Sequence, residues 1–153
     1  MIIVEVMGGL GNQMQQYALY RKLESLGKDA RLDVSWFLDK ERQTKVLASR
    51  KLELSWFENL PAKYCTQEEK QAILGKNTLV GKLKKKLLGG SNQHFTESDM
   101  YHPEIFDLED AYLSGFWACE AYYADILPML RSQIHFPDPE KGEGWDLEAA
   151  AKN

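Results

Sequence analysis

The feature that most constrains this chain is a glycine-rich turn near its N-terminus, placed between an apolar segment and an amphipathic one. Residues 2–7 read Ile-Ile-Val-Glu-Val-Met, a β-branched run with a single charge that is typical of a buried strand. Glycines follow at once, and residues 13–26 then carry leucines at helical spacing. Gly27 is placed to end this helix, and residues 30–34 alternate as a second strand would. Together these segments predict a βαβ unit with parallel strands.

The rest of the sequence alternates short helical and extended patterns, which predicts an α/β domain with a mainly parallel sheet. Thr66 and Glu69 have the spacing of a capping box, so a helix should begin there and end at Leu74, before Gly75. The further predicted elements are a helix over residues 78–88, strands over 94–98 and 112–117, and a helical segment over 120–134 that Pro128 kinks or interrupts.

The composition excludes several classes of protein. Of the 153 residues, 44% are hydrophobic and 11% aromatic, which is too many for an intrinsically disordered chain. The formal net charge of −4 argues against a dedicated nucleic-acid binder, which needs a basic face. Apolar runs are far shorter than a membrane span and no secretory signal is present, so we expect a cytoplasmic protein. Cys65 and Cys119 do not have the spacing of metal ligands, so no metal site is expected.

Two charged segments suggest contacts outside the domain. Residues 138–153 hold five acids and two bases, and a helical pattern that starts near Asp146 continues to the last residue. We therefore expect residues 1–137 to form the domain and residues 138–153 to connect it to a further domain that this chain lacks. Lysines and leucines are interleaved over residues 82–87, as on a solvated helix face or on an amphipathic strip that contacts anionic lipid at the inner membrane surface.

The glycine turn itself, residues 8–13, reads Gly-Gly-Leu-Gly-Asn-Gln. Glycines let a ligand approach bare backbone, and the first amides of the following helix suit an anion or a sugar. As a dinucleotide fingerprint the match is incomplete, because Met14 stands in place of the third glycine, although Asp33 stands where a ribose-binding acid would be. The alternative is that the glycines only shape a tight turn and that Asn12 caps the helix.

The wider pattern resembles a known family. Residues 7–14, Met-Gly-Gly-Leu-Gly-Asn-Gln-Met, directly follow the N-terminal strand and precede Gln-Tyr-Ala at residues 16–18. This looks like the opening signature of the bacterial α-1,2-fucosyltransferases, glycosyltransferase family 11. The other segments that resemble the family are residues 32–35, residues 112–117 with Glu120, Tyr122 and Tyr123, and Leu130 and Arg131 with Phe136. Gln15 and Ala118 depart from the family, which usually has Phe and Gln at these positions.

The resemblance implies a Rossmann-like domain, the N-terminal, acceptor-side half of a two-domain glycosyltransferase of the B type. The implied reaction transfers L-fucose from GDP-fucose to the 2-hydroxyl of a terminal galactoside with inversion, and it needs no metal or other cofactor. The family's His-x-Arg-Arg-Gly-Asp strand end, which holds the donor diphosphate, does not occur in this sequence. We therefore expect the chain to be catalytically inactive alone, and the catalytic base stays unknown.

The substrate-binding residues that the resemblance implies lie in the glycine turn: Gly8, Gly9, Gly11, Asn12 and Gln13. The glycines would give a ligand clearance, and the two amides would hydrogen-bond the donor or acceptor sugar. Phe116 and Trp117 could stack on a sugar ring, but aromatic residues after a strand are more often core. Glu5 is a lone acid in an apolar strand, either near the cleft or at a position that reaches solvent.

Two other functions stay open at this point. A stand-alone nucleotide-binding module or oxidoreductase would use Gly9, Gly11 and Asp33. A non-catalytic carbohydrate-binding or scaffolding domain would bind a glycan without any donor. The partners expected from the favoured function are a nucleotide-sugar donor and a galactoside-terminated glycan, with no nucleic acid.

Overall fold

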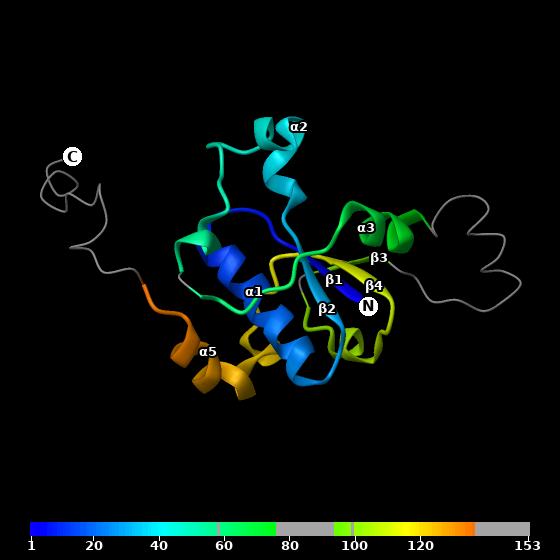
Figure 1. The fold of residues 1–153 in the computed structure, drawn as a ribbon, viewed down its shortest axis with the longest axis vertical. Helices are drawn as coiled ribbons and strands as arrows, with labels where there is room; N and C mark the ends of the chain where they lie inside the picture. The colour runs from blue at the N-terminus through cyan, green and yellow to red at the C-terminus, as the bar shows by residue number, and fades with distance from the viewer. Residues whose placement is uncertain (58, 76–93, 99, 137–153) are drawn as a thin grey trace, which may run out of the picture.

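A parallel β-sheet forms the centre of the molecule. The computed structural model describes residues 1–57, 59–75, 94–98 and 100–136 (Figure 1). Its four strands are β1 (Ile2–Glu5), β2 (Ala30–Asp33), β3 (His94–Thr96) and β4 (Ala111–Ser114), all of which the sequence predicts. They lie in the order β2-β1-β4-β3, and every neighbouring pair is parallel. The chain therefore has an α/β fold with a parallel sheet, as expected.

The predicted βαβ unit is present, and its helix is longer than predicted. Helix α1 (Leu10–Ser25) begins directly after its N-cap, Gly9, so the last residues of the glycine turn form its first turn. At the other end Gly27 adopts a left-handed φ of +77°. Its N–H donates to Glu24 O at 2.9 Å while Lys28 N–H donates to Leu23 O at 3.1 Å, the two bonds of a Schellman motif. The prediction that Gly27 ends the helix is confirmed.

The other helices are short. They are α2 (Lys40–Thr44), α3 (Gln67–Leu74) and α5 (Leu127–Gln133). Helix α3 has the predicted capping box, in which Thr66 and Glu69 each accept a backbone N–H from the other. The single helical segment predicted over residues 120–134 is wrong in part, because two short 3-10 turns (Glu120–Tyr122 and Ala124–Ile126) precede α5. Pro128 lies in the first turn of α5, where its missing N–H costs no hydrogen bond.

Apolar residues cover both faces of the sheet. The larger core packs α1 through Tyr17, Leu19 and Leu23 against strand residues such as Val4 and Leu32, all buried. On the other face Ile73 of α3 packs with Ile3 and Tyr112. Because the strands are covered on both sides, they are apolar along most of their length instead of alternating.

Two predicted features lie outside the described residues: the helix over 78–88 with its lysines, and the connecting segment over residues 138–153. The described part of the chain contains no helix with the length and apolar character that a membrane span requires.

Candidate functional site

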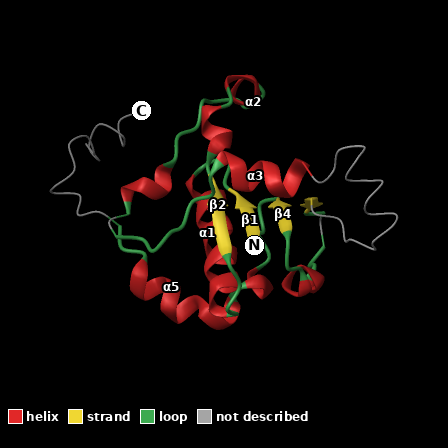
Figure 2. Cartoon of the chain, turned by 45° about the vertical axis from the view of Figure 1, so that its right-hand side comes forward, coloured by secondary structure: helices red, strands yellow, loops and turns green. Residues whose placement is uncertain are grey.

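The carboxyl ends of β1 and β4 mark the point where the chain changes direction across the sheet. From β1 the chain moves to β2 on one side, and the later strands β4 and β3 lie on the other side of β1. Since β1 and β4 are neighbours in the sheet, the segments that follow them lie together at its carboxyl edge, where the Gln16 side chain hydrogen-bonds to both Met7 and Gly115. Figure 2 shows the strands side by side, with α2 beyond the end of β2. In open parallel sheets ligands bind outside the carboxyl ends of the strands, where the chain crosses from one side of the first strand to the other.

A cleft occupies this place, with a volume of about 470 Å³. We call it the switch-point cleft. Its lining comes from the segments that follow three strands: Met7, Gly8, Gly9, Asn12, Trp36, Arg42, Lys45, Val46, Arg50 and Phe116. The volume lies in the range typical of pockets for small molecules, which is about 300–1,000 Å³.

Three of the five predicted site residues line this cleft. Gly8 has a φ of +79°, and a Cβ added to it would lie 2.7 Å from Asn12 Nδ2. Gly8 is therefore glycine for two reasons, its left-handed backbone and the amide packed over it. Gly9 is the N-cap of α1 and has an extended backbone. Asn12 does not cap the helix, since it stands inside the first turn.

The other two predicted residues have different positions. Gly11 is exposed, has no atom within 4 Å of an added Cβ, and is absent from the lining. Gln13 does not face the cleft, because its side chain is fully buried. Its Nε2 donates to Gly8 O and Lys51 O, both at 2.9 Å, and its Oε1 accepts from Glu53 N at 2.8 Å and Leu54 N at 3.2 Å. All four hydrogen-bonding positions of this amide are occupied within the protein.

Gln13 and Gln16 instead hold the walls of the cleft in place. Gln16 is fully buried and joins the turns after two strands: its Oε1 accepts from Met7 N at 3.0 Å and its Nε2 donates to Gly115 O at 2.8 Å. Glu97 supports the second turn, because its Oε2 accepts from the N–H groups of Phe116 and Trp117, both at 2.7 Å. The amide residues at positions 13 and 16 can be seen in the sequence, next to the glycine turn. Only the fold shows that their side chains point into the protein and not into the cleft.

The basic residues of the cleft were not among those predicted from the sequence. Arg42 Nη1 pairs with Glu5 Oε1 at 2.6 Å, and the Glu5 side chain is only 4% exposed. Glu5 is thus neither solvent-exposed nor free. Partial burial alone would lower the pKa of Arg42, but the hydrogen bond and charge of Glu5 outweigh it and raise that pKa. One feature of the sequence could have indicated Arg42: it follows the second predicted strand, and residues that follow neighbouring parallel strands lie at the same edge of the sheet as the glycine turn.

Asp33 is committed to a structural cluster at the end of β2. It accepts from Ser35 N at 2.9 Å and Tyr112 Oη at 2.5 Å, and it pairs with Lys70 Nζ at 2.7 Å. Burial alone would raise the pKa of Asp33, but the bonds from Lys70 and Tyr112 lower it below its ordinary value. Asp33 is 2% exposed. It is therefore not placed as the ribose-binding acid of a dinucleotide site.

The aromatic pair after β4 divides between site and core. Trp117 is fully buried, as expected, and has a left-handed φ of +56°. The expectation of a core position is wrong for Phe116, which is 48% exposed and lines the cleft. The histidines make local contacts: His94 with Ser114 Oγ at 3.0 Å, His102 with Ser98 Oγ at 2.7 Å and Glu104 at 2.8 Å, and His135 with Ser132 O at 2.9 Å.

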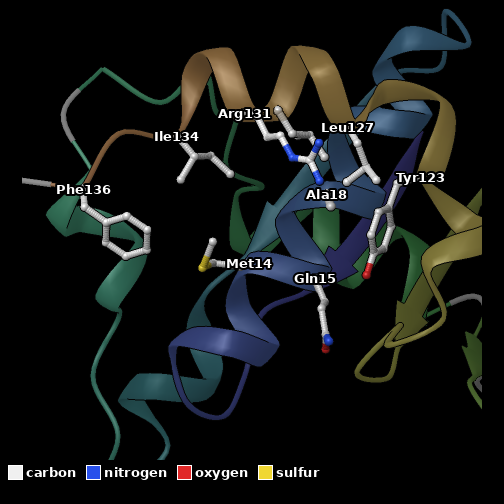
Figure 3. A pocket seen from close by; sticks show the side chains of 9 residues that line it. Met14, Gln15, Ala18, Tyr123, Leu127, Arg131, Ile134 and Phe136 are labelled. Carbon is white, nitrogen blue, oxygen red and sulfur yellow. The ribbon is translucent and has the colours of Figure 1, made fainter.

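A second hollow, about 310 Å³, lies between α1 and α5 and is mostly apolar. Figure 3 shows Met14 and Ala18 of α1 near side chains of α5, with Phe136 at the end opposite Tyr123. Gln15 also lines it, and its Oε1 is buried without a hydrogen-bond partner among the described residues. This groove lacks the convergent polar groups that orient a substrate, so we take the switch-point cleft as the candidate site.

Comparison with known proteins adds no relative: no family model, curated protein or solved structure matches this chain. Within the described residues no group of three or more His, Cys, Asp or Glu side chains is arranged to hold a metal ion.

Proposed function

We propose that this chain is the N-terminal, Rossmann-like part of an inverting α-1,2-fucosyltransferase of the B type. In this proposal the whole enzyme transfers L-fucose from GDP-fucose to the 2-hydroxyl of a terminal galactoside. The observation that supports it is the switch-point cleft, which stands over the glycine turn at the carboxyl edge of a parallel sheet. The motif residues that carry the family resemblance, Gly8, Gly9 and Asn12, are among those that line it.

The cleft offers what sugar binding requires. The bare backbone of Gly8 and Gly9 leaves room for a ring to approach. The Asn12 side chain supplies an amide, which can donate to one sugar hydroxyl and accept from another. Phe116, which is 48% exposed, adds aromatic surface, the usual partner for the apolar face of a sugar ring, whereas Trp36 lines the cleft but is only 6% exposed.

The same lining does not supply a general base. Inversion needs a base near the acceptor hydroxyl, usually a carboxylate or a histidine. The described lining residues include neither. This supports the view that the chain binds substrate but is inactive alone, with the donor-diphosphate site on a further domain. Peripheral contact with an anionic membrane through residues 82–87 is part of the same proposal.

A non-catalytic carbohydrate-binding domain is the second candidate, and the absence of a base from the described lining favours it. The nucleotide-binding alternative has less support, because the Asp33 carboxylate accepts from three groups of the protein itself. Binding measurements separate the two remaining functions. An enzyme half should bind a galactoside in a way that GDP-fucose affects, whereas a binding module should bind the glycan alone.

The test uses the whole 153-residue chain with lactose and GDP-fucose, followed by saturation-transfer NMR and by product analysis. We expect lactose to bind and no fucosylated product to form. Asn12→Ala should weaken lactose binding about 2- to 12-fold, the loss of one hydrogen bond of about 0.5–1.5 kcal/mol. Gln71→Ala, which removes an exposed amide on α3, is the control. Unchanged affinity in Asn12→Ala would refute the site, and transfer by the purified chain would refute the expected inactivity.

A further inference from the structure

The charges around the switch-point cleft do not follow those of the whole molecule. The chain has a formal net charge of −4. The cleft lining nevertheless includes three cationic side chains, from Arg42, Lys45 and Arg50, and no carboxylate among its described residues. All three belong to the short segment after β2, which passes over the glycine turn. A local positive site on an acidic protein indicates a ligand that carries negative charge.

The three cations differ in how well they are compensated. Arg42 is paired with the buried carboxylate of Glu5, so its charge mainly offsets an internal one. Lys45 Nζ lies 3.0 Å from Glu41 Oε1, but their side chains are 68% and 83% exposed, and such a surface pair is weak. Lys45 therefore has only a weakly compensating charge, and Arg50 has none among the described residues.

Arg50 is the best placed of the three to contact a ligand. Its backbone N–H donates to Gln43 Oε1 at 2.9 Å, which fixes the start of the side chain. Its guanidinium forms no hydrogen bond or ion pair within the described residues. It lies against the glycine turn, since its Nη1 would be 3.6 Å from a Cβ added to Gly9. A planar guanidinium suits bidentate contact with a phosphate or carboxylate.

The start of α1 adds to the positive potential. This helix has 16 residues, its N-cap makes no side-chain hydrogen bond, and its first turn contains no acid. By contrast, Thr66 and Glu69 satisfy the first turn of α3. The positive end of the α1 dipole is therefore not offset by a capping side chain and lies beside the guanidinium. Asn12, in the same first turn, brings an amide to the cleft.

We infer that the switch-point cleft binds an oxyanion carried by a sugar, a phosphate or a carboxylate, with Arg50 as its main ligand. That the ligand is a sugar rests on the proposed function, whereas its negative charge is inferred from the cations of the cleft. Two sources share this chemistry: an acidic residue of the acceptor glycan, and the diphosphate of a nucleotide sugar, which Arg50 would then share with the donor site on the further domain. In both cases the ring lies beside Phe116, while the oxyanion meets Arg50 and the first turn of α1.

The experiment measures binding of four probes to the whole chain by calorimetry: inorganic pyrophosphate, galactose 1-phosphate, galacturonate and galactose. We expect galactose 1-phosphate or galacturonate to bind at least about tenfold tighter than galactose at low salt, with the difference reduced by added salt. Pyrophosphate binding indicates the donor source, and preference for galacturonate indicates an acidic acceptor. Arg50→Gln should remove the difference, Arg50→Lys should restore part of it, and Arg131→Gln, outside the cleft, should change nothing.

The outcomes distinguish this inference from the proposed function. If galactose binds as tightly as its acidic analogues, the oxyanion site is refuted while sugar binding stands. If the acidic probes bind Arg50→Gln as they bind the unmodified chain, the assigned ligand residue is wrong. If no probe binds, the oxyanion site is refuted and the sugar-binding function also loses its support. Equal thermal stability of Arg50→Gln and the unmodified chain excludes a folding defect, as expected for an exposed side chain.

Discussion

Gln13 and Gln15 stand two residues apart on α1, and the same substitution should have opposite effects at the two positions. Gln13 is fully buried and makes four hydrogen bonds to backbone groups. Gln15 is partly buried, and its Oε1 is enclosed without a hydrogen-bond partner in the part of the chain that the structure describes. Methionine is close to glutamine in size and has no comparable hydrogen-bonding groups. Replacing each glutamine by methionine therefore compares a satisfied amide with an unsatisfied one in the same helix.

The magnitude follows from the groups left behind. Gln13→Met strands two N–H groups and two carbonyls, at a cost of about 1–3 kcal/mol for each group that stays buried. Of the four bonds, only the one from Leu54 N is wholly buried, so water can reach part of the others. We expect the free energy of unfolding to fall by about 3 kcal/mol, a large share of the roughly 5–15 kcal/mol typical of a domain. Gln15→Met removes a stranded oxygen from an apolar groove and should change stability by between zero and about +1 kcal/mol.

The assay is thermal and urea unfolding of both variants, followed by circular dichroism. For a domain of this size, about 3 kcal/mol corresponds to a fall in Tm of about 10 °C. Gln13→Met should also loosen the cleft, because Gln13 ties the glycine turn to residues 51–54. Equal effects of the two substitutions, or a stable Gln13→Met, would refute the argument that this glutamine is a structural brace.

Three further predictions concern the residues around the sheet edge. Asp33→Asn should lower the free energy of unfolding by about 3 kcal/mol near neutral pH, because it leaves the facing lysine without its buried partner. The pKa of Asp33 is lowered in the folded state, so the stability difference between the two proteins should be complete above pH 3.8, the ordinary pKa of aspartate, and shrink as the pH falls below that value. Urea titrations at several pH values measure this difference. Gly8→Ala should cost about 1–2 kcal/mol from its positive φ, with a further cost from contact with Asn12, and thermal unfolding measures both. Cys119 is exposed whereas burial raises the pKa of Cys65 to about 11, so a disulfide reagent at about pH 8 should label Cys119 at least about tenfold faster.

Each of these has a clear contrary result. A constant stability difference for Asp33→Asn between about pH 3 and pH 7 would show that its ionisation does not stabilise the fold. Full stability of Gly8→Ala would mean that the turn tolerates a different backbone. Equal labelling of the two thiols, checked by mass spectrometry of peptides, would contradict the partial burial of Cys65.

Local sequence determined most of the secondary structure. The strand at residues 2–5, the end of α1 at Gly27 and the capping box at Thr66 were all predictable, because each depends on neighbours within a few positions. The segment over residues 120–134 was harder to predict. Its apolar residues are spaced as in one helix, but the chain forms short turns before Pro128, where a helix can start. Helical periodicity alone does not show where a helix begins.

The candidate site also contains residues that the local sequence predicts and residues that only contacts between distant segments place there. The sequence pointed to the glycine turn, because glycines between a strand and a helix leave the backbone open to a ligand, and Gly8, Gly9 and Asn12 do line the cleft. Nothing local distinguishes the outward Asn12 from the inward Gln13 beside it, since both are amides in the first turns of one helix. The difference arises from segments about 40 residues away, whose backbone groups pair with Gln13. Likewise, only the parallel sheet brings Arg50 over Gly9 and sets Phe116 in the same cleft, because it places the ends of β1, β2 and β4 at one edge. Local patterns therefore determined the elements and one turn of the site, while the tertiary packing decided its charge, its walls and which amide is free.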